Sequence, residues 1–524
     1  MHLSSLPTKE SSLFTLFTLS ILSLSWLFFI LALFNFFVFP VIFIGTLFLG
    51  LTALFFLGRL LVHAPRSTVF TVCLLLLITL GNLLFTTPTL LSGRDQGAIS
   101  EAAIRLSEST TLTYRTPATE TFFAIYGPGK ALNFPGFSYT ANGDVITQFP
   151  LVYTSFLASF HSLFGIAGLT IANGLLLFFF LFTLFELLKL FVRPFYASLG
   201  SLLAGLSFLP LWFSQFTLTE NLAVFLFTLI CYSLIRFLAE PKFTHYASLF
   251  LASSLLMFTR IEGYVFFALI FLFLLTKQPA RKLFATYRLK TLVIPGVFLL
   301  FIFLRNFFIN LPYYKTIGHA LEKFLAGFGS SILSSDNGST LSGQFPVGGV
   351  LILYGVLPLF LCGIFGYFIL WRQKNWRAFL PLFVAAPTLL YLFMPNITLD
   401  HPWMLRRYYF TLYPLFIFST VVGFSVLFGK ARQAHIYFTF LVLILIGFSL
   451  PAHFSLNSAR EDKTLLPQIE KFSQGFSANS LILIDRNATG SGYALPTAPL
   501  NLFYQRQAVY FFNPEDITQI DFKR

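Results

Sequence analysis

The sequence predicts an all-α polytopic membrane protein with about 13 transmembrane helices and a small extracytoplasmic α/β tail. Of its 524 residues, 56% are hydrophobic and only 10% are charged, whereas soluble globular domains carry about 25% charged residues. Phenylalanine occurs 72 times, mostly in apolar runs such as residues 175–185. Runs of about 20 apolar residues match the ~30 Å hydrocarbon core of a bilayer.

The apolar runs divide the chain into two N-terminal spans (1–67), a transmembrane core (68–453) and a tail (454–524). The first run is too long for a signal-peptide core and lacks a small-residue cleavage site, so we expect it to be retained. The predicted spans are 13–34, 37–58, 68–91, 167–188, 196–214, 221–238, 246–259, 263–276, 291–309, 349–370, 378–394, 408–428 and 436–452.

The orientation of the chain depends on residues 148–165, which either cross the membrane or lie in its interface. Cytoplasmic loops carry an excess of Lys and Arg, and only the interfacial interpretation places the basic residues in every second loop. Those loops are 63–66, 189–193, 236–245, 277–290, 372–377 and 430–432. We therefore expect a multi-pass protein of the plasma (inner) membrane, with a cytoplasmic N-terminus and an extracytoplasmic C-terminus. Loops 92–166 and 310–348 then lie outside.

Charge and cysteine content exclude two other classes of site. The net charge is +14, but the basic residues punctuate apolar spans and form no basic stripe, so we expect no nucleic-acid partner. Cys73, Cys231 and Cys362 all lie inside apolar spans, and their spacing indicates neither a metal site nor a disulfide framework.

The tail has the pattern of a small α/β unit. Residues 464–476 are helical in pattern, and residues 480–486 and 507–512 have the apolar content of strands.

Two predicted spans, 246–259 and 263–276, are short. At about 1.5 Å per residue, such helices reach only about 21 Å. They need a thinned bilayer or a water-filled cavity above them. "TRIEG" joins them on the predicted outer side, where Arg260 and Glu262 either form a simple pair or serve a substrate site.

Acidic residues at the predicted outer ends of spans are candidate catalytic groups. Asp95 follows a span and has the position of a general base; the alternative is a solvated acid paired with Arg94. Glu101 lies in the same loop and is a candidate second acid. Glu220 begins a later span as another candidate second acid; alternatively it only complements the helix dipole, with Thr219 as the cap.

Basic residues on the same side are candidate phosphate ligands. Arg406 and Arg407 run against the positive-inside trend, and a guanidinium pairs phosphate oxygens bidentately. The alternative is a basic anchor within an aromatic belt formed with Trp403, Tyr408 and Tyr409.

Other residues of these outer segments are supporting candidates. His401 belongs to the same segment as the paired arginines, and residues 124–144 supply Tyr126 and Lys130. The 124–144 segment lacks the Walker spacing, so we expect a loop that covers the site, with Lys130 as a further phosphate contact.

In order and topology, residues 68–452 resemble the membrane-embedded GT-C glycosyltransferases. The branch includes the protein O-mannosyltransferases, the lipid A aminoarabinose transferase and the Rgt-like lipopolysaccharide sugar transferases. The likeness lies in "GRDQG" with Asp95, the Pro-containing "QFPLVYTSFLASF", "LTENL" with Glu220, "TRIEG", and "HPWMLRRYYFTLYP". The family often has a second acid beside the first, and here a glutamine follows Asp95. The two extra N-terminal spans are a further departure.

The resemblance implies transfer of a hexose or pentose from a polyprenyl-phosphate donor to an acceptor hydroxyl on a glycan, lipid or protein. Asp95 would deprotonate that hydroxyl, and Arg406, Arg407 and Arg260 would hold the departing phosphate. Such chemistry requires no cofactor, although Glu220 leaves a divalent metal open. Membrane lipids are the other expected partners.

Two alternative functions stay open from the sequence. A secondary transporter usually buries ionisable residues at midplane within repeated halves, but these spans are almost free of charge and show no inverted repeat. A surface-polysaccharide polymerase or ligase also uses outer arginines, but loop 310–348 offers only Lys315, His319 and Lys323.

Overall fold

The computed structural model describes most of the apolar part of the chain and portions of its loops and tail. The described residues are 8–86, 95–115, 136–139, 144–311, 314–315, 318, 322, 347–392, 402–429, 431–456, 465–477, 479–485, 496–511 and 515.

Within these residues, 7 helices are long and apolar enough to cross a membrane, or up to 9 if each of two bent helix pairs is one span. The seven are α1 (Thr8–Leu33), α2 (Phe39–His63), α3 (Arg66–Phe85), α7 (Ile166–Lys189), α10 (Thr219–Ala239), η1 with α14 (Leu289–Ile309) and α21 (Ala434–Leu456). The chain is thus a mainly helical, polytopic membrane protein, but the predicted number of about 13 spans is not confirmed.

The two bent pairs lie where the sequence predicts spans 263–276 and 408–428. Helix α12 (Gly263–Thr276) turns by 91° into α13 (Gln278–Thr286). Residues Trp403–Tyr409, which comprise η4 (Trp403–Leu405) and α19 (Arg406–Tyr409), meet α20 (Leu412–Phe428) at 56°. The second bend directs α19 across the end of the bundle and away from the axis of α20.

Breaks in the backbone explain why several predicted spans are shorter than expected. The predicted span 196–214 divides into α8 (Pro194–Leu206) and α9 (Phe208–Phe213) at Ser207, whose backbone is extended. Pro210 lacks the amide hydrogen that would continue α8. The predicted span 349–370 divides into α16 (Val347–Leu353) and α17 (Val356–Arg372) at Gly355, whose φ is +71°.

The remaining short segments are also helical. The predicted span 378–394 consists of η2 (Trp376–Phe379), α18 (Leu380–Ala385) and η3 (Ala386–Leu392). The predicted span 246–259 corresponds to α11 (Phe243–Met257), which together with α12 forms the expected short pair around the "TRIEG" link.

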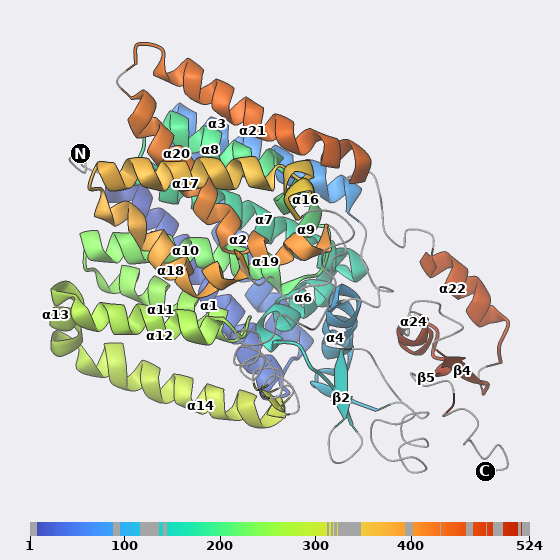
Figure 1. Ribbon diagram of the computed structural model, residues 1–524. Helices are drawn as coiled ribbons and strands as arrows, with labels where there is room; N and C mark the ends of the chain where they lie inside the picture. Colours follow the sequence, from blue (N-terminus) through green and yellow to red (C-terminus); the bar gives the residue numbers. More distant parts are fainter. Residues whose placement is uncertain are drawn as a thin grey trace.

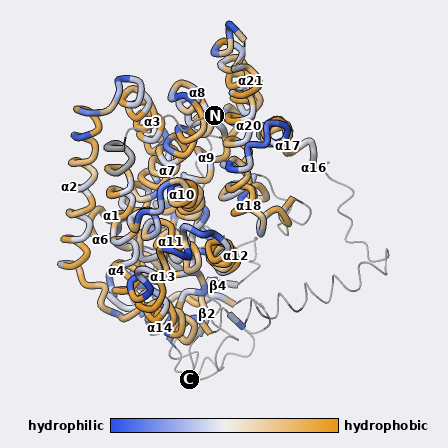
Figure 2. The backbone as a smooth tube through the Cα atoms, turned by 90° about the vertical axis from the view of Figure 1, so that its left-hand side faces the viewer, coloured by the Kyte–Doolittle hydropathy of each residue, from blue (hydrophilic) through white to orange (hydrophobic). Residues whose placement is uncertain are grey.

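Helices at the edges of the bundle, such as α14 and α21 (Figure 1), are much less buried than α7 and α10. In α7 and α10, 89% of the apolar window is buried inside the protein, whereas in α2, α14 and α21 only 28%, 17% and 22% is buried. Figure 2 shows hydrophobic residues along most of the helices, with hydrophilic residues at turns such as α13. Apolar side chains that face outward on these edge helices are the ones expected to contact lipid tails.

The segment whose crossing the sequence leaves open forms α6 (Leu151–Phe164), a helix that packs against α1, α7 and α4 (Asp95–Ser109). Its first ten residues are all buried, and the Tyr153 hydroxyl donates a 2.6 Å hydrogen bond to Asn173. The interfacial placement and the orientation of the chain stay predictions.

One small sheet lies beside α4, and a second lies in the tail. Strands β1 (Thr113–Tyr114), β3 (Val145–Thr147) and β2 (Phe137–Tyr139) form an antiparallel sheet in that order. The tail contains the expected helix, α22 (Leu465–Gln474), and both expected strands. These strands, β4 (Leu481–Asp485) and β5 (Gln507–Phe511), pair in parallel, and α24 (Thr497–Leu502) lies between them in sequence.

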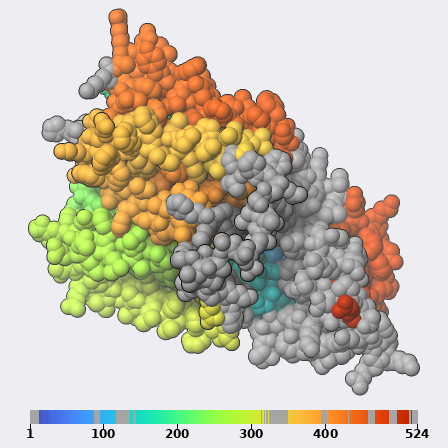
Figure 3. All heavy atoms as spheres, viewed as in Figure 1, coloured from blue at the N-terminus to red at the C-terminus, as the bar shows by residue number. Residues whose placement is uncertain are grey.

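Helices α17 and α20 approach closely because glycines line their contact. A Cβ atom added to Gly423 would lie 2.5 Å from the Cα of Gly366, and one added to Gly363 would meet the ring of Phe416. Small residues let membrane helices approach closely enough for extensive van der Waals contact. Figure 3 shows α17 and α21 side by side at the surface of the bundle. The contact positions α20, and therefore α19, which precedes it.

We expect Gly423→Val to destabilise the protein by about 1–3 kcal/mol, because the branched side chain would overlap the backbone of α17. The matched control is Gly447→Val in α21, where an added Cβ would meet nothing within 4 Å. Thermal unfolding in detergent should show a lower midpoint for the first variant only. Equal midpoints for the two variants would contradict the close helix contact.

Candidate functional site

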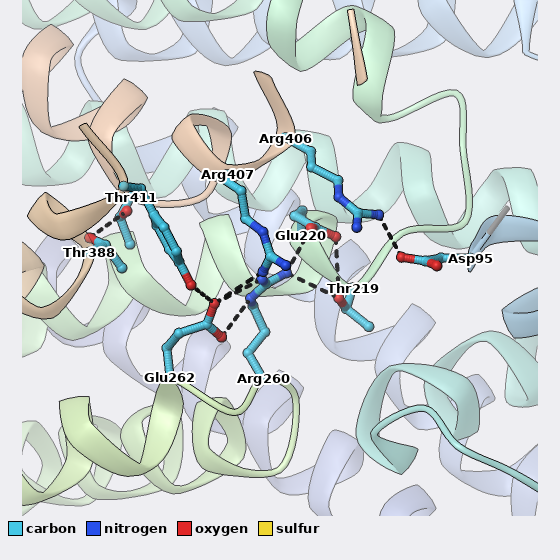
Figure 4. A network of polar contacts seen from close by, with 10 residues as sticks. Asp95, Thr219, Glu220, Arg260, Glu262, Thr388, Arg406, Arg407 and Thr411 are labelled. Carbon is cyan, nitrogen blue, oxygen red and sulfur yellow. Dashed lines mark hydrogen bonds and ion pairs between the residues drawn. The ribbon is translucent and has the colours of Figure 1, made fainter. Parts of the chain in front are cut away.

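Charged side chains from four segments meet where the ends of several helices converge (Figure 4). The segments are the start of α4, the start of α10, the link between α11 and α12, and α19. The charged members of this network are Asp95, Glu220, Arg260, Glu262, Arg406 and Arg407.

Arg260 is the buried centre of the network. Its Nη1 lies 2.7 Å from Glu220, and its Nε and Nη2 donate to the two carboxylate oxygens of Glu262 at 3.2 and 3.1 Å. Nη1 also donates to the hydroxyl of Thr219 at 3.4 Å, and the guanidinium stacks 4.5 Å from the ring centre of Phe410. Because all three nitrogens of Arg260 already donate to protein atoms, little of this guanidinium is left for a ligand.

Glu262 binds two arginines and a tyrosine at once. Besides Arg260, it accepts a 3.3 Å hydrogen bond from Arg407 and another from the hydroxyl of Tyr391 in η3. Burial opposes ionisation of this carboxyl group, but Arg260, Arg407 and Tyr391 outweigh burial and lower its pKa to about 2. Glu262 is therefore ionised throughout the physiological range.

Asp95 is the first residue of α4 and pairs with Arg406 at 2.5 Å. Its side chain is 42% exposed, against 4% for Glu220 and 12% for Glu262. Among the three carboxylates of the network, Asp95 is thus the one most accessible to a second reactant. The alternative partner considered from the sequence, Arg94, lies outside the described residues.

Arg406 and Arg407 retain donors that the protein does not use. Each makes one ion pair through Nη1, and the Nε atom of each is buried with no hydrogen-bond partner in the described part of the chain. Both side chains are about a quarter exposed, at 23% and 25%. Each guanidinium therefore has hydrogen-bonding capacity that its carboxylate partner does not use, in Arg406 beside Asp95 and in Arg407 beside Glu262.

Aromatic packing fixes the position of the arginines. Trp403 packs against Phe216 with ring centres 4.7 Å apart, and Tyr409 stacks on Phe213 at 5.3 Å. Trp403, Tyr408 and Tyr409 are all buried. The interpretation of these residues as an aromatic belt is therefore wrong, because their rings pack inside the protein and do not face lipid headgroups.

Two further expectations about the acids need correction. Thr219 does not cap α10: the N-cap is Leu218, without a side-chain bond, and the Thr219 hydroxyl donates to Glu220 instead. Glu101 does not join the network, because it is buried on α4 and forms an i,i+4 pair with Arg105 at 2.7 Å. Glu220 itself is buried against Arg260, so it does more than complement the helix dipole.

Some candidates cannot be placed. Tyr126, Lys130 and His401 lie outside the described residues. Within the part of the chain that the structure describes, no group of three or more His, Cys, Asp or Glu side chains could hold a metal ion.

The structure also adds residues that sequence reasoning missed. Tyr391 reaches Glu262 across 129 residues of sequence, and Phe410 lies under Arg260. Neither residue stands in a pattern that differs from the apolar sequence around it, so no sequence signal could have singled them out.

Comparisons with known proteins give a distant likeness in structure alone. No family model matches the chain, and no curated protein matches it. Among solved structures, it is similar to the archaeal oligosaccharyltransferase AglB from Archaeoglobus fulgidus, determined with an inhibitory peptide and a dolichol-phosphate. The identity is 12% and the TM-score 0.47, over 86% of this chain and 65% of that chain. A likeness at this level assigns no role to any residue here.

We expect Arg260→Ala to destabilise the protein by about 3–5 kcal/mol, because Glu220 and Glu262 would be left buried without their central cation. The matched control is Arg59→Ala, since Arg59 is exposed and its contacts among the described residues are with Phe55 and His63 of the same helix, α2. Chemical or thermal unfolding in detergent measures the difference. A loss for Arg260→Ala no larger than for Arg59→Ala would contradict the central role of this guanidinium.

Proposed function

We propose that the chain is a glycosyltransferase that moves a sugar from a polyprenyl-phosphate donor to an acceptor hydroxyl on the extracytoplasmic face of the membrane. The observation that carries the proposal is the pair Arg406 and Arg407: each has an Nε donor without a partner among the described residues, and Arg406 lies against the partly exposed carboxylate of Asp95. The resemblance of the sequence segments that supply these residues to the GT-C glycosyltransferases supports the same assignment.

The arginines divide into a structural group and a ligand-binding group. Arg260 is committed to Glu220 and Glu262, so we assign it the positioning of the link and of α10. Arg406 and Arg407 each keep one buried Nε donor without a partner among the described residues, and their side chains are partly exposed, so they are assigned to the phosphate of the sugar donor. Their planar forks suit phosphate oxygens, which a guanidinium can pair bidentately.

The charge of the leaving group explains why two arginines are needed. The donor is a phosphodiester with one negative charge, and the released polyprenyl phosphate carries close to two. Cations aimed at the phosphate therefore stabilise the transition state more than the bound donor, which is the condition for catalysis.

The transfer itself requires one base. Asp95 accepts the proton of the acceptor hydroxyl, and the hydroxyl oxygen forms a bond to the anomeric carbon of the sugar. The bond between that carbon and the phosphate oxygen breaks, and its electron pair stays on the phosphate between Arg406 and Arg407. The 42% exposure of Asp95 leaves room for an acceptor to reach it.

The ion pair between Asp95 and Arg406 acts as a resting state of the base. Without donor, Arg406 holds the Asp95 carboxylate at 2.5 Å. A donor phosphate competes for the same guanidinium and frees the carboxylate for the acceptor. Binding of the sugar donor therefore also activates Asp95 as a base.

A transporter is less consistent with this arrangement. Ionisable residues of transporters usually lie near the midplane, whereas Asp95, Glu220, Glu262 and the arginines of α19 lie at the ends of helices. The three carboxylates of the described network are all paired with arginines, so none of these three is an isolated acid of the kind that couples ion transport.

We expect Asp95→Asn to lower the rate of sugar transfer by about 10²–10⁴-fold, the usual contribution of a general base. Purified protein would be incubated with a panel of polyprenyl-phosphate hexoses and pentoses and with glycan, lipid and protein acceptors. Release of polyprenyl phosphate is the measured quantity. Glu108→Gln, an exposed acid on the same helix, is the control that should keep full activity. Full activity of Asp95→Asn would refute the base assignment.

We expect the same Asp95→Asn protein to bind polyprenyl phosphate about two- to fivefold more tightly than the wild type. The substitution removes the anion that competes for Arg406, and a partly exposed ion pair contributes up to about 1 kcal/mol. Calorimetry in detergent measures the affinity, with Glu108→Gln again unchanged. Weaker binding by Asp95→Asn would contradict the competition between carboxylate and phosphate.

A further inference from the structure

A small pocket with both polar and apolar walls adjoins the charged network on the side of Arg260. It lies between the start of α6, the link between α11 and α12, and the end of α14, and its volume of about 20 Å³ is enough for one hydroxyl group or one water molecule. Beside Arg260, its lining includes Phe149, Pro150, Tyr264, Asn306, Asn310 and Tyr314.

The polar side chains of this pocket form one hydrogen-bonded chain. The Asn310 amide donates to Asn306 Oδ1 at 2.9 Å, and the Asn306 amide donates to the hydroxyl of Tyr314 at 2.9 Å. The hydroxyls of Tyr314 and Tyr264 lie 2.7 Å apart. Each member therefore holds the next, and the orientation of Asn310 is fixed by its neighbours.

One buried atom of these hydrogen-bonded side chains has no hydrogen-bond partner among the described residues. Asn310 is 5% exposed, and its Oδ1 atom accepts no hydrogen bond from any described residue. Asn310 lines the pocket, and a buried polar atom that stays unpaired costs free energy, so a ligand or an ordered water that pairs with this atom would stabilise the site.

The chemistry of the unpaired atom restricts the ligand. Asn310 Oδ1 is an acceptor, so the ligand must bring a hydrogen-bond donor. A phosphodiester offers only acceptors, which excludes the donor phosphate from this position. A sugar hydroxyl satisfies the requirement, and the sugar of the donor is bonded directly to the phosphate. Because Arg260 lines the pocket and also belongs to the charged network, a sugar next to that phosphate could reach it.

We propose that Asn310, held by Asn306 and Tyr314, forms a hydroxyl-selective subsite that recognises one hydroxyl group of the donor sugar. The inference rests on the proposed function and adds to it a determinant of donor selectivity. The pocket takes one hydroxyl and not the whole ring, because its volume is about 20 Å³.

The test compares the binding of two kinds of ligand, the lipid phosphate without a sugar and the sugar donors, by three proteins. The ligands are polyprenyl phosphate and a panel of polyprenyl-phosphate hexoses and pentoses, and the proteins are the wild type, Asn310→Leu and Asn82→Leu. The last is the control, because Asn82 is a buried asparagine that bonds to Ser214 away from this pocket. We expect Asn310→Leu to bind polyprenyl phosphate like the wild type but to bind the preferred sugar donor about three- to tenfold more weakly, the usual effect of one lost hydrogen bond. Asn82→Leu should bind both ligands as the wild type does.

Monodeoxy donors separate sugar recognition from a structural effect. In the wild type, removal of one particular hydroxyl should weaken binding by the same factor as Asn310→Leu, and in Asn310→Leu its removal should have no further effect. Equal sensitivity of both proteins to every deoxy position would overturn the subsite and leave the pocket with water only. A parallel loss of polyprenyl phosphate binding in Asn310→Leu would also overturn it, because the effect would not be specific to the sugar. Failure of the wild type to bind polyprenyl phosphate would overturn the proposed function, and the subsite with it.

Discussion

The rest of the site depends on Arg260, a buried cation held between two buried carboxylates. Charges removed from water are costly unless each finds a well-oriented partner, and Glu220 and Glu262 supply those partners from different helices. The cluster therefore forms only when the start of α10 and the link between α11 and α12 lie together. Three charged side chains, in a chain that has few, thus fix the positions of these helix ends relative to one another.

Exposure increases across the network, and the chemical roles follow that gradient. The side chain of Arg260 is 7% exposed, those of Arg406 and Arg407 are 23% and 25% exposed, and that of Asp95 is 42% exposed. The buried end is saturated with protein contacts, whereas the outer end has Nε donors without partners among the described residues and an accessible base. The residues that support the site and the residues proposed to react are therefore at opposite ends of one connected set of side chains, which is a preorganised arrangement.

The sequence identifies the charged members of this site but not how they pair. Asp95, Glu220, Arg260, Glu262 and the two arginines of α19 all stand out because charge is rare near apolar spans. Their pairing could not be predicted, since Arg406 meets Asp95 across 311 residues. Hydropathy also did not predict where two of the spans are broken, because it does not report the extended backbone at Ser207 or the positive φ at Gly355.

Charge balance connects the resting ion pair to the proposed reaction. The network contains three carboxylates and three guanidiniums, so the empty site is close to neutral. When Asp95 takes the proton of the acceptor, the anion that competes for Arg406 disappears as the leaving phosphate gains its second negative charge. The proton transfer that starts the reaction therefore strengthens the hold on the leaving group. Once Asp95 loses that proton, its carboxylate competes again for Arg406 and favours release of the lipid phosphate.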